Sequence, residues 1–306
     1  MPKASALVPA HNEEQNIGQL LRRIVEESDP SSWELDDIIV IASGCTDGTV
    51  SQAQAVRQAG HPVRIIEQER REGKASAINL GLKAARHNVI LLASGDIMPE
   101  PGAIRALLRR MQDPTIGAVG GRPVPLNDTD SFTGFATHLL WRLHDRISAA
   151  SPDNPKCGEM IAFRRALRGR PIVPEIPTDS AVDEVSIQAQ VSAAGLRSAY
   201  ASEAIVHNWG PSTFRDWFAQ RRRINAGHIL STRQGFSPST MRTTEILRAV
   251  SRDPVALRHP LRLAAVASTE LVARIWAHVD IARGHSHTVW TLARTTKRAI
   301  QEELPD

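Results

Sequence analysis

The segment N-V-I-L-L-A-S-G-D, residues Asn88 to Asp96, carries the strongest local pattern in this 306-residue sequence. Five of its first six residues are apolar, which predicts a strand that is buried on both faces of a sheet. The segment turns polar at Ser94-Gly95-Asp96, where glycine permits a tight bend. Ligands of open α/β sheets bind beyond the carboxyl ends of the strands, so Asp96 is a candidate to hold a divalent cation against a diphosphate. The alternative is that Asp96 only caps the helix that follows.

The composition predicts a folded protein with one large α/β domain and additions to it. The sequence is 42% hydrophobic and 23% charged, which is typical of globular proteins. The formal net charge of +4 is too small to indicate nucleic-acid binding, so we expect no nucleic-acid partner. Cys45 and Cys157 match no metal-binding spacing. Residues 1–10 lack the apolar core of a signal peptide, and no window resembles a membrane span, so we expect a cytoplasmic protein.

Strand and helix patterns alternate along the first two thirds of the chain with short connections between them. This alternation predicts an α/β fold, in which a mostly parallel sheet carries helices on both faces. From residue 239 to residue 301 we expect a helical C-terminal extension, so that residues 1–235 form one domain and residues 236–306 the other. The predicted strands are 5–9, 37–41, 62–67, 88–93, 116–121, 156–163 and 197–207, and the predicted helices are 17–27, 49–59, 74–86, 99–112, 130–149, 183–195 and 212–232.

The order of the motifs resembles that of the family 2 glycosyltransferases of the GT-A fold, over about residues 4 to 230. Each motif is weak alone, but seven in the family's order are a specific pattern. The motifs are V-P-A-H-N-E-E (8–14), I-I-V-I-A-S-G-C-T-D-G-T (38–49), G-K-A-S-A-I-N-L-G-L (73–82), S-G-D (94–96) at the place of the family's Asp-X-Asp, C-G-E-M-I-A-F-R-R (157–165), D-E (183–184) and Q-X-X-R-I (220–224). The resemblance implies a Rossmann-like catalytic domain that inverts the configuration of a sugar taken from a nucleotide-diphosphate donor.

Three departures from the family pattern concern the donor and the cation. Ala42-Ser43 stands where the family has an acidic pair beside the base and ribose, so the donor stays open between a UDP-sugar, slightly favoured, and a GDP-sugar. Ser94 replaces the first Asp of Asp-X-Asp, which leaves Asp96 as the one certain carboxylate. Ile224 replaces the Trp of the last motif, which weakens any inference of a processive polymerase.

The resemblance also implies roles for individual residues. Glu184 is the expected catalytic base with Asp183 in reserve, although acids in the first turn of a helix are also common as caps. Asp96 and His207 are the expected ligands of Mn²⁺ or Mg²⁺, the alternative for His207 being a hydrogen bond to the loop that follows it. Gln220 and Arg223 share a helix face at the i,i+3 spacing. The expected nucleotide-binding residues are Pro9, Ala10, Glu13, Ser43, Lys74, Gly95 and Asp96, and the expected acceptor- or sugar-binding residues are Gly158, Glu159, Gln220 and Arg223.

Two other functions remain open from the sequence alone. A sugar-1-phosphate nucleotidyltransferase shares the fold class but needs a Gly-rich, Arg-containing loop after the first strand, where this chain has His11-Asn12-Glu13-Glu14. A non-catalytic nucleotide-sugar-binding or scaffold protein fits the carboxylates missing at Ser94 and at Ala42-Ser43.

The C-terminal extension bears on the acceptor and on the location of the protein. Residues 261–281 alternate apolar runs with Arg262, Glu270, Arg274 and His278, which fits either a helical cover or an interfacial helix. An interfacial helix would hold the protein on the inner face of the membrane. The acceptor is accordingly expected to be a small molecule or a lipid-linked molecule, and the oligomeric state stays open.

Overall fold

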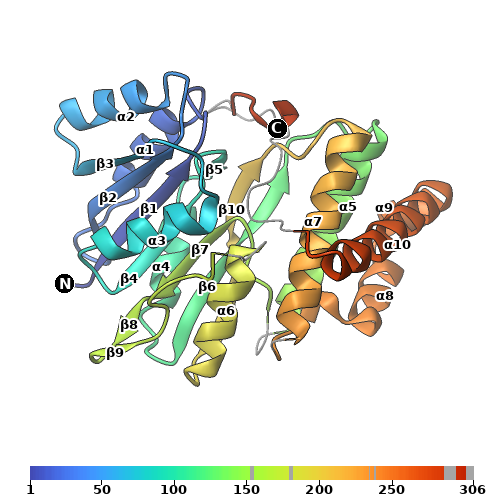
Figure 1. Ribbon diagram of the computed structural model, residues 1–306. Coiled ribbons are helices and arrows are strands. Elements are labelled where there is room, and N and C mark those ends of the chain that lie inside the picture. The colour runs from blue at the N-terminus through green and yellow to red at the C-terminus, as the bar shows by residue number, and fades with distance from the viewer. Residues whose placement is uncertain (152–154, 179–181, 234, 238, 286–293, 301–306) are drawn as a thin grey trace.

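The computed structural model describes residues 1–151, 155–178, 182–233, 235–237, 239–285 and 294–300. Its centre is an eight-stranded sheet with the order β3-β2-β1-β4-β7-β6-β10-β5 (Figure 1). Strands β3, β2, β1 and β4 are parallel, as are β6 and β10, whereas β7 is antiparallel to β4 and β6, and β5 is antiparallel to β10. The strands are β1 Lys3–Ala10, β2 Glu34–Ser43, β3 Val63–Gln68, β4 Val89–Ala93, β5 Ile97–Pro99, β6 Ile116–Pro125, β7 Met160–Arg164 and β10 Arg197–Asn208, with a separate ribbon of β8 Ala166–Leu167 and β9 Arg170–Pro171.

Helices cover both faces of this sheet, so the predicted fold class is confirmed. Apolar residues of α1, α2 and α4 pack on one face and form one buried cluster with β1 and β2. Apolar residues of α3 and α6 pack on the other face. The helices are α1 Ile17–Glu26, α2 Thr49–Gln58, α3 Lys74–Ala84, α4 Ala103–Arg110, α5 Phe132–Ala149, α6 Asp183–Ala193, α7 Phe214–Arg233, α8 Thr243–Ser251, α9 Pro254–Arg258 and α10 Pro260–Ala282, with 3₁₀ turns at Ser239–Met241 and Arg294–Thr296.

Strand β4 lies between β1 and β7 near the middle of the sheet, and all its residues are buried. The run of apolar residues is explained by this position, because helices cover the strand on both sides. Leu92 of β4 pairs with Leu7 of β1, so both strands deliver their carboxyl ends to the same edge of the sheet. The polar segment after β4 therefore lies beside the loop that follows β1.

Two predicted elements of the sheet half begin four residues later in the structure. The predicted helix 99–112 is shorter, because Ile97–Pro99 pairs with β10 as a strand and the left-handed Gly102, at φ 87°, precedes the helix that begins at Ala103. The predicted strand 156–163 begins only at Met160.

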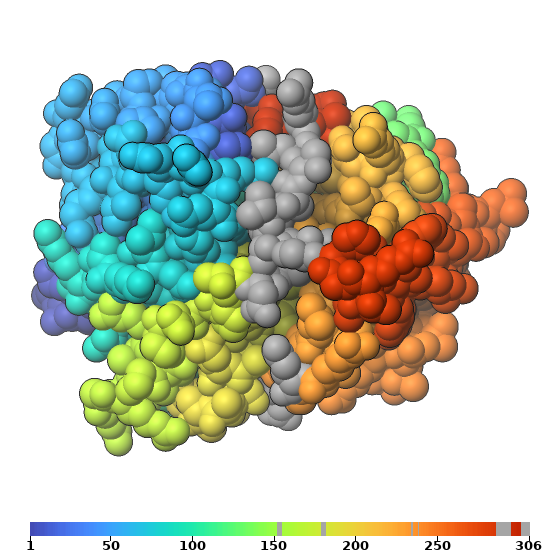
Figure 2. Space-filling model, in the orientation of Figure 1, coloured from blue at the N-terminus to red at the C-terminus, as the bar shows by residue number. Residues whose placement is uncertain are grey.

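The helical half of the molecule consists of α5 and α7 to α10, and in Figures 1 and 2 its mostly orange and red helices lie beside the sheet half. Helix α10 is held on α7 by two ion pairs. Arg221 Nη2 donates to Glu270 Oε2 at 3.1 Å, and Arg222 Nη2 donates to Asp280 Oδ1 at 2.6 Å. No described helix is long and apolar enough to span a bilayer.

The predicted helical C-terminal extension is confirmed by α8, α9 and α10, but the described residues 294–300 that come after them are not α-helical. Residues 294–296 form a single 3₁₀ turn, and residues 297–300 have no regular structure. This segment does not lie against α10. It returns to the sheet half and lies near the N-terminal helices, where Figure 1 shows it in red beside blue elements. Residue 301 itself lies outside the described residues.

Candidate functional site

A cavity of about 1420 Å³ lies between the carboxyl edge of the sheet and the helices α5, α7 and α10. Residues from both ends of the sequence line it, so the site joins the sheet half to the helical half. Most of the residues predicted from the sequence are in its wall, namely Pro9, Ala10, Glu13, Ser43, Lys74, Asp96, Gly158, Glu159, Asp183, Glu184, Gln220 and Arg223.

The loops that follow β1 and β2 are fastened to each other at one end of the cavity. His11 Nδ1 lies 2.6 Å from the carbonyl oxygen of Ser43, and the amide of Thr46 donates to Asn12 Oδ1 at 2.8 Å. Gly95 does not line the cavity, but a Cβ atom there would lie 2.8 Å from Cγ of Glu13. The absence of a side chain at residue 95 therefore allows Glu13 to pack against the end of β4.

The carboxylates of Asp183 and Glu184 begin α6 and face Lys74, which begins α3. Lys74 Nζ lies 3.2 Å from Glu184 Oε1 and 3.7 Å from Asp183 Oδ2. Burial and the neighbouring Glu184 raise the pKa of Asp183, even though Lys74 opposes the rise. Burial, the largest single effect, acts to raise the pKa of Glu184, but the charge and hydrogen bond of Lys74, a backbone hydrogen bond and the charge of Lys156 together lower it. The pair thus holds one carboxylate that ionises easily beside one that retains its proton more readily.

Glu159 adds a third carboxylate to the cavity wall, and its backbone is unusual. Its φ is 25°, in a region that residues other than glycine rarely adopt, and such strain is often found at functional sites. Burial, together with the charges of Asp96 and Glu184, raises the pKa of Glu159 to about 7. The preceding Gly158 fits tightly, since a Cβ there would lie 3.2 Å from the Trp141 ring.

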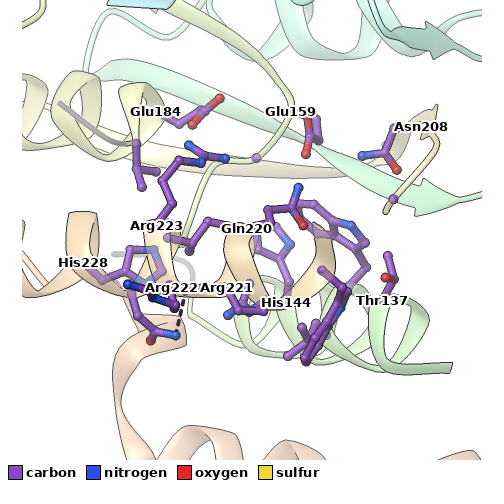
Figure 3. A pocket seen from close by; sticks show the side chains of 18 of the residues that line it. Thr137, His144, Glu159, Glu184, Asn208, Gln220, Arg221, Arg222, Arg223 and His228 are labelled. Atoms are coloured by element: carbon purple, nitrogen blue, oxygen red, sulfur yellow. Dashed lines mark hydrogen bonds between the residues drawn. The ribbon is translucent and has the colours of Figure 1, made fainter. Parts of the chain in front are cut away.

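Helix α7 supplies the facing wall. Figure 3 shows Gln220 and Arg223 on α7 directed toward the wall that carries Glu184, Glu159 and Asn208. The adjacent Arg221 and Arg222 instead bind the acids of α10 described above. Of these four polar residues of α7, two face the cavity and two bind α10. The i,i+3 spacing of Gln220 and Arg223 predicts that these two share one face.

The end of the cavity beside Asp96 has the chemistry of a hard-cation site. Buried oxygen atoms without a hydrogen-bond partner in the described part of the chain line it, and they include Glu13 Oε2, Ser43 Oγ, Ser94 Oγ and Asn208 Oδ1. Magnesium and manganese prefer oxygen ligands, so these residues and Asp96 fit such an ion. The described residues form no group of three or more His, Cys, Asp or Glu side chains suited to a metal. An ion here would therefore need further ligands from a diphosphate or from water.

His207 does not join Asp96 in this structure, so the expected ligand pair is not formed. Its Nδ1 lies 3.1 Å from the carbonyl oxygen of Val124, and its Nε2 lies 2.8 Å from Glu100 Oε1. Successive residues of a strand point to opposite faces, so Asn208, the next residue of β10, lines the cavity in its place. The alternative of a hydrogen-bonded, structural histidine describes this geometry better, although the partners of the ring lie in β6 and in the turn before α4, not in the following loop.

Several cavity residues were not predicted from the sequence. Lys156 precedes β7, and burial lowers its pKa. His144 of α5 is buried, which lowers its pKa to about 3 and makes the imidazole neutral at pH 7. Lys297 comes from the C-terminal segment. His144 lies three residues after Trp141 in α5, and this helical spacing could have indicated that both face the same cavity. No local sequence pattern indicates Lys297.

The sheet order, the cavity at the carboxyl edge and the acid pair at the start of α6 define a fold of the GT-A class. Residues 5–169 match the family model described as glycosyl transferase family 2, which is more than half of the chain. The chain therefore belongs to glycosyl transferase family 2, and the resemblance drawn from its motifs is confirmed.

Curated relatives align with only part of the chain. A dodecaprenyl-phosphate galacturonate synthase of Rhizobium johnstonii is 33% identical over 111 residues, which cover 35% of this chain and 32% of the relative. A dolichol-phosphate mannosyltransferase of Mycosarcoma maydis is 30% identical over 149 residues, which cover 48% of each chain. The chain thus spans about a third to a half of the length of these relatives.

Solved structures support the fold. A mannosyltransferase from Pyrobaculum calidifontis, in complex with GDP-Man and Mn²⁺, has a TM-score of 0.60 at 23% identity and covers 97% of this chain and 83% of its own. The glucosyl-3-phosphoglycerate synthase from Mycobacterium tuberculosis, in complex with Mn²⁺, UDP and glucosyl-3-phosphoglycerate, has a TM-score of 0.53 at 21% identity and covers 78% of this chain and 82% of its own.

Proposed function

We propose that this chain is an inverting glycosyltransferase that moves a sugar from a nucleoside-diphosphate donor to an acceptor hydroxyl or phosphate. The observation that carries the proposal is the meeting of Asp183, Glu184 and Lys74 with Asp96 in one cavity at the carboxyl edge of the sheet. Sugar transfer needs a base for the acceptor and a cationic environment for the leaving diphosphate. This cavity offers both. The acids at the start of α6 can supply the base, and Lys74 at the start of α3 supplies a positive charge.

Glu184 is the base in this proposal, and Asp183 is its neighbour in reserve. The acceptor oxygen attacks the anomeric carbon from the face opposite the diphosphate, the bond from that carbon to the diphosphate breaks, and the proton of an acceptor hydroxyl passes to Glu184. The lowered pKa of Glu184 keeps it ionised and ready to accept a proton. An acceptor phosphate that is already ionised needs no such transfer.

The nucleotide lies, in this proposal, against the end of the cavity lined by Pro9, Ala10, Glu13 and Ser43. Asp96, Asn208 and Ser94 would hold the Mg²⁺ or Mn²⁺ ion beside it. When bound, that ion neutralises the charge of the leaving diphosphate. We retain UDP-sugars as the first donors to test and GDP-sugars as the second.

The acceptor is placed at the other end of the cavity, beside Gly158, Glu159, Gln220 and Arg223. The guanidinium of Arg223 suits a phosphate or a sugar hydroxyl. Apolar residues of α5, α7 and α10 continue the wall beyond it, which suits a lipid-linked acceptor as well as a small molecule; they include Leu140, Ile224, Val266 and Leu271. The names of the curated relatives contain polyprenyl-phosphate acceptors, and the mycobacterial relative is bound to a phosphoglycerate product.

A donor screen tests the proposal directly. Purified protein is incubated with UDP- and GDP-sugars in Mn²⁺ or Mg²⁺, with polyprenyl phosphate or phosphoglycerate as acceptor, and released nucleoside diphosphate is measured. We expect release with one donor class, stimulated by the correct acceptor and, where that acceptor is a hydroxyl, lost in the Glu184→Gln variant. Binding of donor without release under any of these conditions would instead favour a non-catalytic nucleotide-sugar-binding protein.

We further propose that α10 contacts a membrane surface, which places the protein peripherally on the cytoplasmic face. Leu271, Val272, Ile275 and Trp276 are exposed on this helix, by 44% to 61%, and basic residues such as Arg274 lie among them. An apolar face with interspersed arginines binds anionic interfaces through burial and charge together.

Replacing Ile275 with Glu is expected to reduce binding to phosphatidylserine-containing vesicles by about tenfold, because it places a charge in the apolar face. Vesicle co-sedimentation measures the effect. Ala55→Glu on α2 is the matched control, since Ala55 is also exposed on a helix but lies in the sheet half. Equal vesicle binding by wild type and Ile275→Glu would show that α10 is only a cover for α7.

A further inference from the structure

The segment 294–300 is built into the sheet half by hydrogen bonds at both of its ends. Asn16 Nδ2 donates to the carbonyl oxygen of Arg298 at 2.8 Å, and the amide of Ile300 donates to Asn16 Oδ1 at 2.9 Å. Ile300 is only 2% exposed and belongs to the buried cluster of α1 and β1. At the other end, the amide of Ser212 donates to Thr295 Oγ1 at 3.2 Å.

Trp209 adds a further attachment between these two ends. Its indole Nε1 donates to the carbonyl oxygen of Ala299 at 3.2 Å, and the Arg298 guanidinium lies 5.2 Å from its ring centroid. Polar contacts and core burial together argue that the segment is a fixed wall of the molecule. A detachable plug would not need a buried Ile300 or a two-way pairing with Asn16, which itself is 1% exposed.

Lys297 is the residue that this fixed segment carries to the donor end of the cavity. Its ammonium pairs with Glu13 Oε1 and lies 4.0 Å from Asp96 Oδ2. The hydrogen bond to Glu13 uses one of the three N–H donors of the ammonium, and Asp96 is beyond hydrogen-bond distance. Lys297 lines both the main cavity and a small adjoining cavity of about 360 Å³ at residues 12–16.

The charges around this point explain why a cation is needed there. Glu13, Glu14, Asp47 and Asp96 all lie at this end of the cavity system and would repel a diphosphate. Lys74, the other lysine close to Asp96, is already engaged by Asp183 and Glu184. An additional ammonium beside Asp96 offsets this negative charge where a nucleoside diphosphate would lie.

We propose that Lys297 binds the diphosphate of the nucleotide donor, so that the segment 294–300 forms part of the donor site. The proposal rests on the proposed function, because it names a binding residue for the same donor. Lys297 itself lies outside the matched family region, which ends at residue 169. A single hydrogen-bonded charge pair of this kind commonly changes affinity by about tenfold or more.

The test compares wild type with Lys297→Gln and Lys297→Arg by NMR titration with UDP and GDP, and with uridine and guanosine, in EDTA and in Mn²⁺. We expect Lys297→Gln to weaken binding of the preferred nucleoside diphosphate by about tenfold or more in both conditions, while nucleoside affinity changes by less than about twofold. Lys297→Arg should retain most of the affinity, because it retains the charge. Lys83→Gln is the control for loss of one lysine, since Lys83 is exposed at the end of α3.

Three outcomes would overturn the proposal. Unchanged diphosphate affinity in Lys297→Gln shows that Lys297 only neutralises Glu13, and tighter binding shows that it blocks the site. A parallel loss of nucleoside and diphosphate affinity shows a structural role for the lysine. Failure of the proposed function looks different, because wild type would then bind nucleoside diphosphate without turning over any donor.

Discussion

With a hydroxyl acceptor, Glu184→Gln is expected to lower turnover by about 10² to 10⁴-fold while leaving the affinity for the donor nearly unchanged. General-base catalysis contributes an effect of this size, and the amide cannot accept the acceptor proton. Gln retains the size of the side chain and a hydrogen-bond acceptor for Lys74, whose Nζ lies 3.2 Å from Glu184 Oε1. Steady-state kinetics with a separate measurement of nucleotide binding distinguish lost chemistry from lost donor binding.

Asp183→Asn and Glu175→Gln complete this experiment. Asp183→Asn tests the other half of the acid pair, and Glu175→Gln is a matched acid-to-amide change at an exposed loop residue. If Asp183→Asn is inactive and Glu184→Gln turns over normally, the base is Asp183. If both variants are active, the two acids only cap α6, and the base of the single-displacement mechanism is another residue.

Asp96→Asn is expected to abolish the metal dependence of nucleotide binding. Asp96 is the carboxylate of the proposed ligand set of Asp96, Asn208 and Ser94. The diphosphate would add ligands to the ion and the ion would neutralise the diphosphate, so their binding should be positively coupled. In wild type, Mn²⁺ should tighten nucleoside-diphosphate binding by about tenfold or more, and the nucleotide should tighten Mn²⁺ binding by the same factor. Calorimetric titration of nucleotide and electron paramagnetic resonance of free Mn²⁺ measure the two sides of this coupling.

His207→Gln is the informative comparison for Asp96→Asn. The His207 ring is held by Glu100 and Val124 outside the cavity, so its replacement should leave the coupling intact after correction for any change in thermal stability. Loss of coupling in His207→Gln would show that His207 is a ligand of the metal ion, as the family resemblance implies. Coupling that survives in Asp96→Asn, or full activity in excess EDTA, would remove the cation from the proposal.

The sheet half was largely predictable from the sequence because its signals are local. The apolar run of β4 and the alternation of strands with amphipathic helices need only a window of about 10 to 18 residues to be recognised. Strand β5 was missed because its three residues form a strand only through pairing with β10, which lies more than a hundred positions later. Partners that lie far apart in sequence leave no periodicity in a segment of this length.

Site residues could be predicted where a motif ends a strand or begins a helix. They could not be predicted where the direction of a side chain from a strand decides whether it enters the cavity. Lys74, Asp96, Asp183 and Glu184 stand at such ends, and the structure brings them into one cavity. For His207 the apolar pattern of β10 gave no indication of which face meets the cavity, and a shift of one residue exchanges the two faces. The chemical roles of Asp96, Glu184 and His207 stay predictions, which the variants described above test.

The pairing of Asn16 with the segment 294–300 has a consequence for how the protein is synthesised. Asn16 and Ile300 are separated by 284 positions. At roughly 5 to 20 residues per second, the ribosome releases the second partner about 15 to 60 s after the first. During that interval the nascent sheet half can fold around β1 and β4, but the position that Lys297 occupies beside Glu13 stays open to water. Nucleotide binding should consequently increase only after the segment 294–300 has left the ribosome and docked beside Asn16.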